Sequence, residues 1–260
     1  MKCSFAEVQY FHRNYKPNPI TKRIDFIGFD SESDINGFPF MFTFSDGMVC
    51  NLDNLLDTLF SRQYRGVKFV CFNLRYDEGS ILHLLSKEAL DELRIKGKTI
   101  YNGYSYKSIP KKELVIGKGH KSVAFYDIAQ FFATSLDKAA AEFLGKSKKE
   151  IDVSLFEGDF ILDNWDKIAE YSIYDALLTK ELADYFIDLL IRDLKIYPQK
   201  LYSTGYLAGI HFSRTCDIVD INRYYKNHIK LVEYGYNSYA GGKFETYKRG
   251  YGYFYQYSNR

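Results

Sequence analysis

The sequence predicts an α/β or α+β fold, in which strands come first and helices are interleaved with them. Short apolar runs rich in β-branched and aromatic residues, the pattern of buried strands, stand at residues 23–30, 38–44 and 67–72. A helical repeat covers residues 165–194, where apolar side chains recur every three or four positions. Acidic side chains stand at the ends of several of these elements. We therefore expect a mixed central sheet flanked by helices, and assign the chain to the α/β class.

Three strands are expected near the start of the chain. Residues 23–30 form an apolar run that ends in Asp30, and phenylalanines alternate with other residues along 38–44. An Asp-Gly pair at 46–47 is typical of a tight turn and leads into a short strand at 48–51.

Helices and further strands follow. Leucines at 52–60 fall on one helical face, and the strand at 67–72 is followed by a helix with apolar residues at 81–85. Residues 96–121 are rich in Gly, Lys and Tyr, and we expect a loop or hairpin there. The sheet resumes at 123–127.

The second half of the chain is expected to be mainly helical. Ser135 suits the N-cap of a helix that runs to Leu144, and Gly145 is a stop signal. After the long helix, two further helical stretches near 206–216 and 223–233 lead into a Gly- and Tyr-rich tail. With 260 residues, the chain can form one large domain or one domain with a small appendage.

Three parts are expected along the chain. Residues 1–22 read as a lead-in, 23–196 as the main domain, and 197–260 as a helical, aromatic-rich extension. A net charge of +2 does not indicate a strongly basic nucleic-acid coat, although local Lys and Arg groups can still hold phosphates. Four scattered cysteines form no metal-ligand spacing, and no membrane span or signal peptide is found. We expect a soluble, cytoplasmic protein.

Three acidic motifs carry the chemistry that the sequence indicates. They are Asp30-Ser31-Glu32, then residues 73–77 (Asn-Leu-Arg-Tyr-Asp), then residues 171–175 (Tyr-Ser-Ile-Tyr-Asp). Alternate strand residues point to one face, so Asp30 and Glu32 can share a site. A spacing of four places Tyr171 and Asp175 on one helix face.

Each motif also has an ordinary interpretation. Asp30 and Glu32 could lie at a solvated strand end, Asp77 could be a helix N-cap, and the third motif could belong to an amphipathic helix. The combination favours a site, because four carboxylates are the ligands that a pair of Mg²⁺ or Mn²⁺ ions needs to cleave a phosphodiester bond.

In order and spacing, the three motifs resemble the exonuclease motifs of B-family DNA polymerases, most closely the protein-primed branch. The resemblance covers about residues 23–190 and implies a ribonuclease-H-like fold with four-acid 3′–5′ exonuclease activity. It implies that Asp30, Glu32, Asp77 and Asp175 bind two metal ions and that Tyr171 orients the attacking water.

The resemblance also implies contacts with a single-stranded DNA 3′ end. Ser33, Asn73 and Tyr76 match positions that hold terminal nucleotides. Lys148 matches a lysine near the scissile bond, although a solvated lysine is an equal alternative. The family's Ser/Thr-Leu element fits residues 135–136 by type, but the N-cap interpretation of Ser135 can suffice.

The tail resembles the junction between the exonuclease and the polymerase of this family. Tyr239, Gly241 and Gly242 match its Tyr-x-Gly-Gly element, whose glycines let the backbone approach DNA, although a plain tight turn is the alternative. The polymerase palm should follow, but Gln256 stands where its first metal-binding Asp is expected. We therefore expect no DNA synthesis by this chain alone, and partners such as a separate polymerase subunit or a terminal protein.

The sequence thus predicts a proofreading 3′–5′ exonuclease that acts in DNA replication. The alternative from a different class is a nucleic-acid-binding or polymerase-assembly module with a vestigial nuclease site. A ribonuclease of the same fold is a third interpretation, because nothing in the sequence sets a preference concerning the 2′-hydroxyl.

Overall fold

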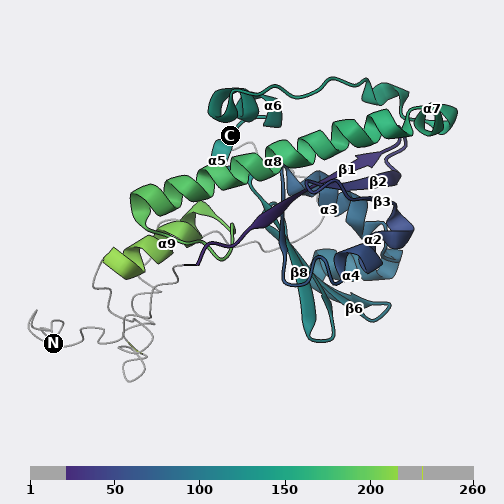
Figure 1. Ribbon diagram of the computed structural model, residues 1–260. Helices are drawn as coiled ribbons and strands as arrows, with labels where there is room; N and C mark the ends of the chain where they lie inside the picture. The colour runs from purple at the N-terminus through teal and green to yellow at the C-terminus, as the bar shows by residue number, and fades with distance from the viewer. Residues whose placement is uncertain (1–21, 216–229, 231–260) are drawn as a thin grey trace, which may run out of the picture. The chain divides into compact units, whose positions relative to one another are not determined.

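An eight-stranded sheet in the order β3-β2-β1-β4-β8-β7-β6-β5 frames residues 22–215, which the computed structural model describes together with residue 230 (Figure 1). Strand β1 pairs in parallel with β4, and β4 pairs in parallel with β8, whereas the other neighbours are antiparallel. The strands are β1 (Phe26–Ser33), β2 (Pro39–Phe44), β3 (Val49–Cys50), β4 (Lys68–Cys71), β5 (Lys98–Tyr101), β6 (Tyr104–Ile109), β7 (Glu113–Lys118) and β8 (Lys121–Asp127).

Helices cover both faces of this sheet, and their bounds follow capping signals in the sequence. Asn51, Ser86 and Ser135 each cap the helix that follows them with a side-chain oxygen. The helical elements are α2 (Leu52–Leu59), α3 (Leu74–Leu82), α4 (Lys87–Lys96), α5 (Ala129–Phe132), α6 (Leu136–Ala139), a π-helical turn (Ala140–Leu144), a 3₁₀ turn (Val153–Leu155), α7 (Gly158–Asp163), α8 (Trp165–Leu194) and α9 (Thr204–Thr215).

The two sheet faces bury two different apolar clusters. On one face Phe29, Phe69 and Phe125 pack together across three neighbouring strands. Phe69 stacks on Phe125 and Phe29 meets it edge to face, each with a centroid distance of 5.0 Å, and α2, α3 and α4 add their apolar residues. On the other face Phe26 packs with residues of α8. Figure 1 shows α8 crossing the sheet on the side opposite α2, α3 and α4. The arrangement is a three-layer α/β fold, as the sequence predicts.

Gly28 allows α8 to pack directly on β1. A Cβ atom built on Gly28 would lie 1.8 Å from the carbonyl oxygen of Ala176, well inside van der Waals contact. Residues later in the same strand, from Asp30 onward, therefore lie beside the neighbouring turns of α8. This contact sets the distance between the first and the third acidic motif.

Most predicted elements are present, and α8 has the predicted bounds. The expected hairpin over residues 96–121 is present, because β5 pairs antiparallel with β6, and β6 with β7. Two details differ from the predictions. Helix α4 was not expected. Asp77 does not open a helix as an N-cap, because it lies inside α3 one turn after the start at Leu74.

The structure bears in part on two other expectations, the absence of a membrane span and the division of the chain into three parts. No helix in the described part of the chain is long and apolar enough to cross a membrane. Asn18–Thr215 forms one compact unit. The division into 1–22, 23–196 and 197–260 stays a prediction, because much of the first and last parts, including the helix expected near 223–233, lies outside the described residues.

Replacing Gly28 by Ala tests the contact between β1 and α8. We expect Gly28→Ala to lower the free energy of unfolding by about 3 kcal/mol, because the new methyl group meets rigid helix backbone. The same change at Gly209 in α9, where a Cβ meets nothing within 4 Å, should be neutral or stabilising. Urea denaturation of both variants measures the difference, and equal stabilities would contradict this packing.

Candidate active site

All predicted site residues that the structure describes line one cavity of about 300 Å³. They come from β1, from the turn and helix after β4, from α8, and from the loop before α7. The lining residues are Asp30, Ser31, Glu32, Ser33, Phe72, Asn73, Tyr76, Asp77, Lys148, Val153, Tyr171 and Asp175. The predicted residues Tyr239, Gly241 and Gly242 lie outside the described residues.

Strand alternation sends the first motif toward both faces of the sheet. Asp30 faces α8, where its Oδ2 accepts a hydrogen bond of 3.1 Å from Ser172 Oγ. Ser31 faces α3, and its Oγ donates to Asp77 Oδ1 at 2.9 Å. The cavity lies at the end of β1, where side chains from both faces meet. Asp30 reaches it from the face of the sheet that α8 covers, and Asp77 from the helix on the other face.

Ser172 and Thr43 form a hydrogen-bonded chain behind Asp30. Ser172 is fully buried, and its Oγ lies 2.8 Å from Thr43 Oγ1 on β2. Because Ser172 donates its proton to Asp30, Thr43 donates to Ser172. Neither hydroxyl was predicted from the sequence to belong to the site. The only signal was the position of Ser172 next to Tyr171, which does not reveal its partner.

Asn73 stands in a left-handed conformation between β4 and α3, with φ 71° and ψ 60°. This conformation is uncommon for residues other than Gly, and Asn tolerates it better than most. Asp127, at the end of β8, holds the turn, because its Oδ1 accepts from the backbone N–H of Asn73 at 3.2 Å and of Ala129 at 2.9 Å. The strained turn places Asn73 at the cavity wall.

Lys148 is the cation of the cavity lining. Its Nζ lies 2.6 Å from Asp175 Oδ2 and 4.9 Å from the ring centroid of Tyr171. The backbone N–H of Lys148 donates to Asp137 Oδ1 at 3.0 Å, which holds the loop against α6. Asp137 was not predicted. Ser135, which was considered above as part of a Ser/Thr-Leu element, caps α6 and does not line the cavity.

The carboxylates raise one another's pKa. Burial and then repulsion from Asp175 raise the pKa of Asp30 to about 7. Burial and then repulsion from Asp30 and Asp175 raise the pKa of Glu32 to about 9. The pKa of Asp77 is raised well above its usual value by burial and by Asp30. This mutual repulsion is the property expected of a site that binds positive charge.

The ion pair with Lys148 offsets only part of this repulsion. Burial raises the pKa of Asp175 in spite of the hydrogen bond from Lys148. Burial alone would lower the pKa of Lys148, but hydrogen bonds with Asp175 and Tyr171 outweigh it and raise the pKa. One ammonium thus stands among four carboxylates, Asp30, Glu32, Asp77 and Asp175.

The donor chemistry fits divalent cations, whereas the side-chain positions do not yet form a metal cluster. Asp175 Oδ1 is buried and has no hydrogen-bond partner, so it is free to bind a cation. In the described part of the chain, however, no three His, Cys, Asp or Glu side chains are arranged to hold a metal ion. Metal binding therefore requires side-chain movement, including a shift of Lys148 from Asp175.

Comparison with known proteins gives limited information. No family model and no curated protein matches the chain. The structure is similar to that described as "Phi29 DNA polymerase complexed with single-stranded DNA", with a TM-score of 0.46 and 14% sequence identity over 78% of this chain. The match covers 36% of that polymerase, so the chain spans about a third of its length. At this level the similarity assigns no activity.

The buried carboxylates predict an unusual pH dependence for the metal-free protein. The folded pKa of Glu32, about 9, lies above its ordinary value, so the folded state binds more protons than the unfolded state between about pH 4 and pH 9. The free energy of unfolding should therefore fall as pH rises through this range. Thermal unfolding in a chelator measures this dependence.

Glu32→Gln isolates the contribution of one group. We expect it to flatten the fall with pH and to raise the melting temperature at pH 8 by on the order of 5 °C. Glu157→Gln, at an exposed acid, is the matched control and should leave both unchanged. Parallel pH curves for the wild type and Glu32→Gln would show that Glu32 is not destabilising.

Proposed function

We propose that the chain is a metal-dependent 3′–5′ exonuclease of the ribonuclease-H-like type, acting on single-stranded DNA ends as the proofreading part of a B-family, protein-primed polymerase system. The observation that supports this most directly is the convergence of four carboxylates and Tyr171 in one buried cavity, from motifs up to 145 residues apart (175 − 30). The carboxylates repel one another there, and either protonation or a bound cation relieves this repulsion.

Asp30, Glu32, Asp77 and Asp175 are the residues that would hold the metal ions. Two bound Mg²⁺ or Mn²⁺ ions would supply a nucleophilic hydroxide at neutral pH and neutralise the charge on the leaving 3′-oxygen. Tyr171, which lines the same cavity one helical turn before Asp175, would orient the attacking water through its hydroxyl. Lys148 would turn its ammonium from Asp175 to the negatively charged phosphate.

The opposite wall of the cavity suits a nucleotide. Tyr76 is half exposed, with 49% of its surface accessible, so its ring can stack on a base. The amide of Asn73 and the hydroxyl of Ser33 are hydrogen-bonding groups for sugar and phosphate. A paired 3′ end must first unstack, which costs a few kcal/mol, whereas a frayed end does not. The site would therefore act first on mismatched ends, which is proofreading.

The rest of the system follows from the same proposal. DNA synthesis would be supplied by a separate polymerase subunit, and a terminal protein would be a further partner. The proposed setting is the cytoplasm, where Mg²⁺ and replicating DNA are both present.

Removing the first motif tests the chemistry. We expect Asp30→Ala/Glu32→Ala to lower the rate of degradation of a 3′-labelled single strand in Mg²⁺ by at least about a hundredfold, because two of four ligands are lost. Glu157→Ala/Asp159→Ala is the matched control, since it removes two exposed acids with the same spacing. Undiminished 3′–5′ degradation by the folded first variant would rule out the assignment.

A vestigial nuclease site in a nucleic-acid-binding module is the second candidate function. Two observations favour it: the Lys148–Asp175 ion pair of 2.6 Å, and the lack of a metal-holding group among the described residues. Calorimetric titration with Mn²⁺ separates the two functions. An active nuclease should take up two ions, and Lys148→Ala should tighten their binding, because a competing charge is removed. Absence of any binding heat in both proteins would favour the vestigial site.

A further inference from the structure

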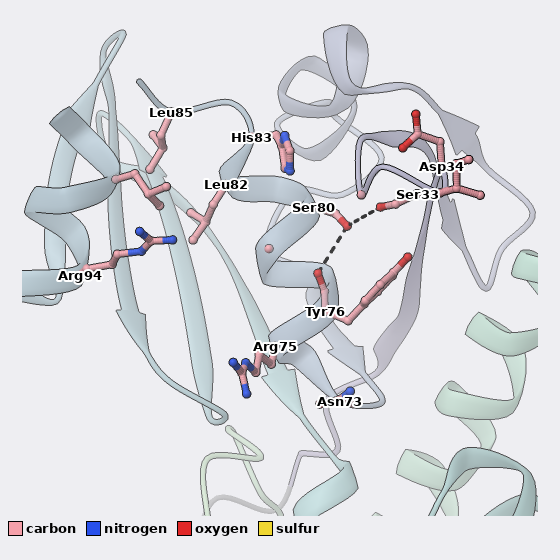
Figure 2. A pocket seen from close by; sticks show the side chains of 14 residues that line it. Ser33, Asp34, Asn73, Arg75, Tyr76, Ser80, Leu82, His83, Leu85 and Arg94 are labelled. Carbon is pink, nitrogen blue, oxygen red and sulfur yellow. Dashed lines mark hydrogen bonds between the residues drawn. The ribbon is translucent and has the colours of Figure 1, made fainter. Parts of the chain in front are cut away.

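A second cavity of about 790 Å³ adjoins the carboxylate cavity and shares Ser33, Asn73 and Tyr76 with it (Figure 2). Its volume falls in the range of ligand-binding pockets. Its floor is the outer face of α3, because Tyr76, Gly79 and His83 recur at intervals of three and four. The cavity therefore continues from the wall of the proposed active site along one helix.

Gly79 keeps this surface open in the middle. A Cβ atom built on Gly79 meets no atom within 4 Å, although the residue lies inside a helix. Glycine lowers helix stability by about 1 kcal/mol relative to alanine, so nothing in the local packing accounts for it. Its effect is to leave α3 without a side chain between Tyr76 and the far end of the cavity.

Two arginines line this cavity. In Figure 2 the side chain of Arg94 extends from α4 toward Leu82, and Arg75 lies at the start of α3, whereas Tyr76 lies on the side of Ser33. Arg75 forms no ion pair within the described residues, and Arg94 has only a contact of 3.9 Å with Asp91. Both guanidinium groups are thus available for phosphate.

One acid also lines this cavity. Asp34 Oδ1 accepts hydrogen bonds from the backbone N–H groups of Asn36 at 2.9 Å and Phe38 at 2.8 Å, so it is held in its own loop, away from Arg94 (Figure 2). Two arginines and one aspartate give the lining a net positive charge beside an apolar surface.

The hollow on the other side of the active site is less suited to a strand. It is lined by three lysines, of which Lys148 pairs with Asp175 and Lys149 with Glu170. The third lysine is Lys167, and Glu150 and Asp152 also line the hollow. Two of its three lysines are thus held in close ion pairs, whereas neither arginine over α3 is, within the part of the chain that the structure describes.

We propose that the outer face of α3, from Tyr76 across Gly79 to Arg94, binds the nucleotides that precede the terminal one in single-stranded DNA. Arg75 and Arg94 contact their phosphates, and Leu82 contacts sugar or base. This inference rests on the proposed function, because it takes the carboxylate cavity as the place of the 3′-terminal nucleotide. The surface makes affinity rise with strand length and selects strands over free nucleotides.

Fluorescence anisotropy with labelled oligothymidylates tests the surface in the full chain. Binding is measured in a chelator, so that no cleavage occurs, with strands of two and of about eight nucleotides. For Arg75→Gln/Arg94→Gln we expect the gain in affinity on lengthening to fall about tenfold. The slope of log affinity against log salt should become shallower by about 1.4, because two phosphate contacts are lost.

Gly79→Leu and Arg62→Gln complete the experiment. Gly79→Leu fills the open surface without a steric clash, and it should also abolish the gain on lengthening. Arg62→Gln removes an exposed arginine outside the cavity and should change nothing. The inference would be overturned if the gain in affinity with length stayed unchanged in Arg75→Gln/Arg94→Gln and in Gly79→Leu. An equal loss in Arg62→Gln would also overturn it.

The result is separable from the test of the nuclease. If Asp30→Ala/Glu32→Ala is inactive while the arginine variant binds normally, the proposed strand-binding surface is wrong and the proposed nuclease activity is retained. If that acid variant still degrades DNA while the arginine variant loses its gain with length, the surface stands as a strand-binding site and the carboxylate nuclease is wrong.

Discussion

The contact between Gly28 and α8 is the constraint on which the arrangement of the acidic residues depends. The backbone of β1 touches that of α8 near Ala176. Two residues further along the strand stands Asp30, and one turn back along the helix stands Ser172, which hydrogen-bonds it at 3.1 Å. A larger residue at position 28 would push α8 outward and separate the first motif from the third. The close packing of α8 on β1 therefore also determines how near the carboxylates of the first and third motifs lie to each other.

The same proximity opposes folding. Four buried carboxylates in one cavity repel each other, and their raised pKa values record the free energy lost when they ionise. The surrounding structure must supply that free energy, and much of its buried apolar surface is gathered around Phe29, Phe69 and Phe125. A cavity that holds four carboxylates is therefore maintained at the expense of stability, which is common for functional sites.

Much of the layout could be predicted, because it depends on local pattern. The long repeat defined α8, and motifs attached to clear strands or helices met in one cavity, as expected. Helix α4 was missed because only Ala89 and Leu93 of its side chains are buried. Two signals were nevertheless present, the cap residue Ser86 and the left-handed Gly97.

The turn of the hairpin between β5 and β6 had a specific signal too. Asn102 and Gly103 both have positive φ, the conformation of the two-residue turn that Asn-Gly sequences favour. By contrast, no sequence pattern could show that Asp137 holds the loop of Lys148, or that Thr43 lies behind Ser172. Those pairs join distant segments, and only the completed packing brings them together.

The ion pair between Lys148 and Asp175 has a consequence for how metal ions would bind. Because the loop is tied to α6 through Asp137, the ammonium is delivered to the cavity by the fold itself. The carboxylate cavity thus contains one positive charge that the chain itself supplies. If the proposed metal ions bind, they would replace the ammonium of Lys148 beside Asp175, so that metal binding would exchange one positive charge for another.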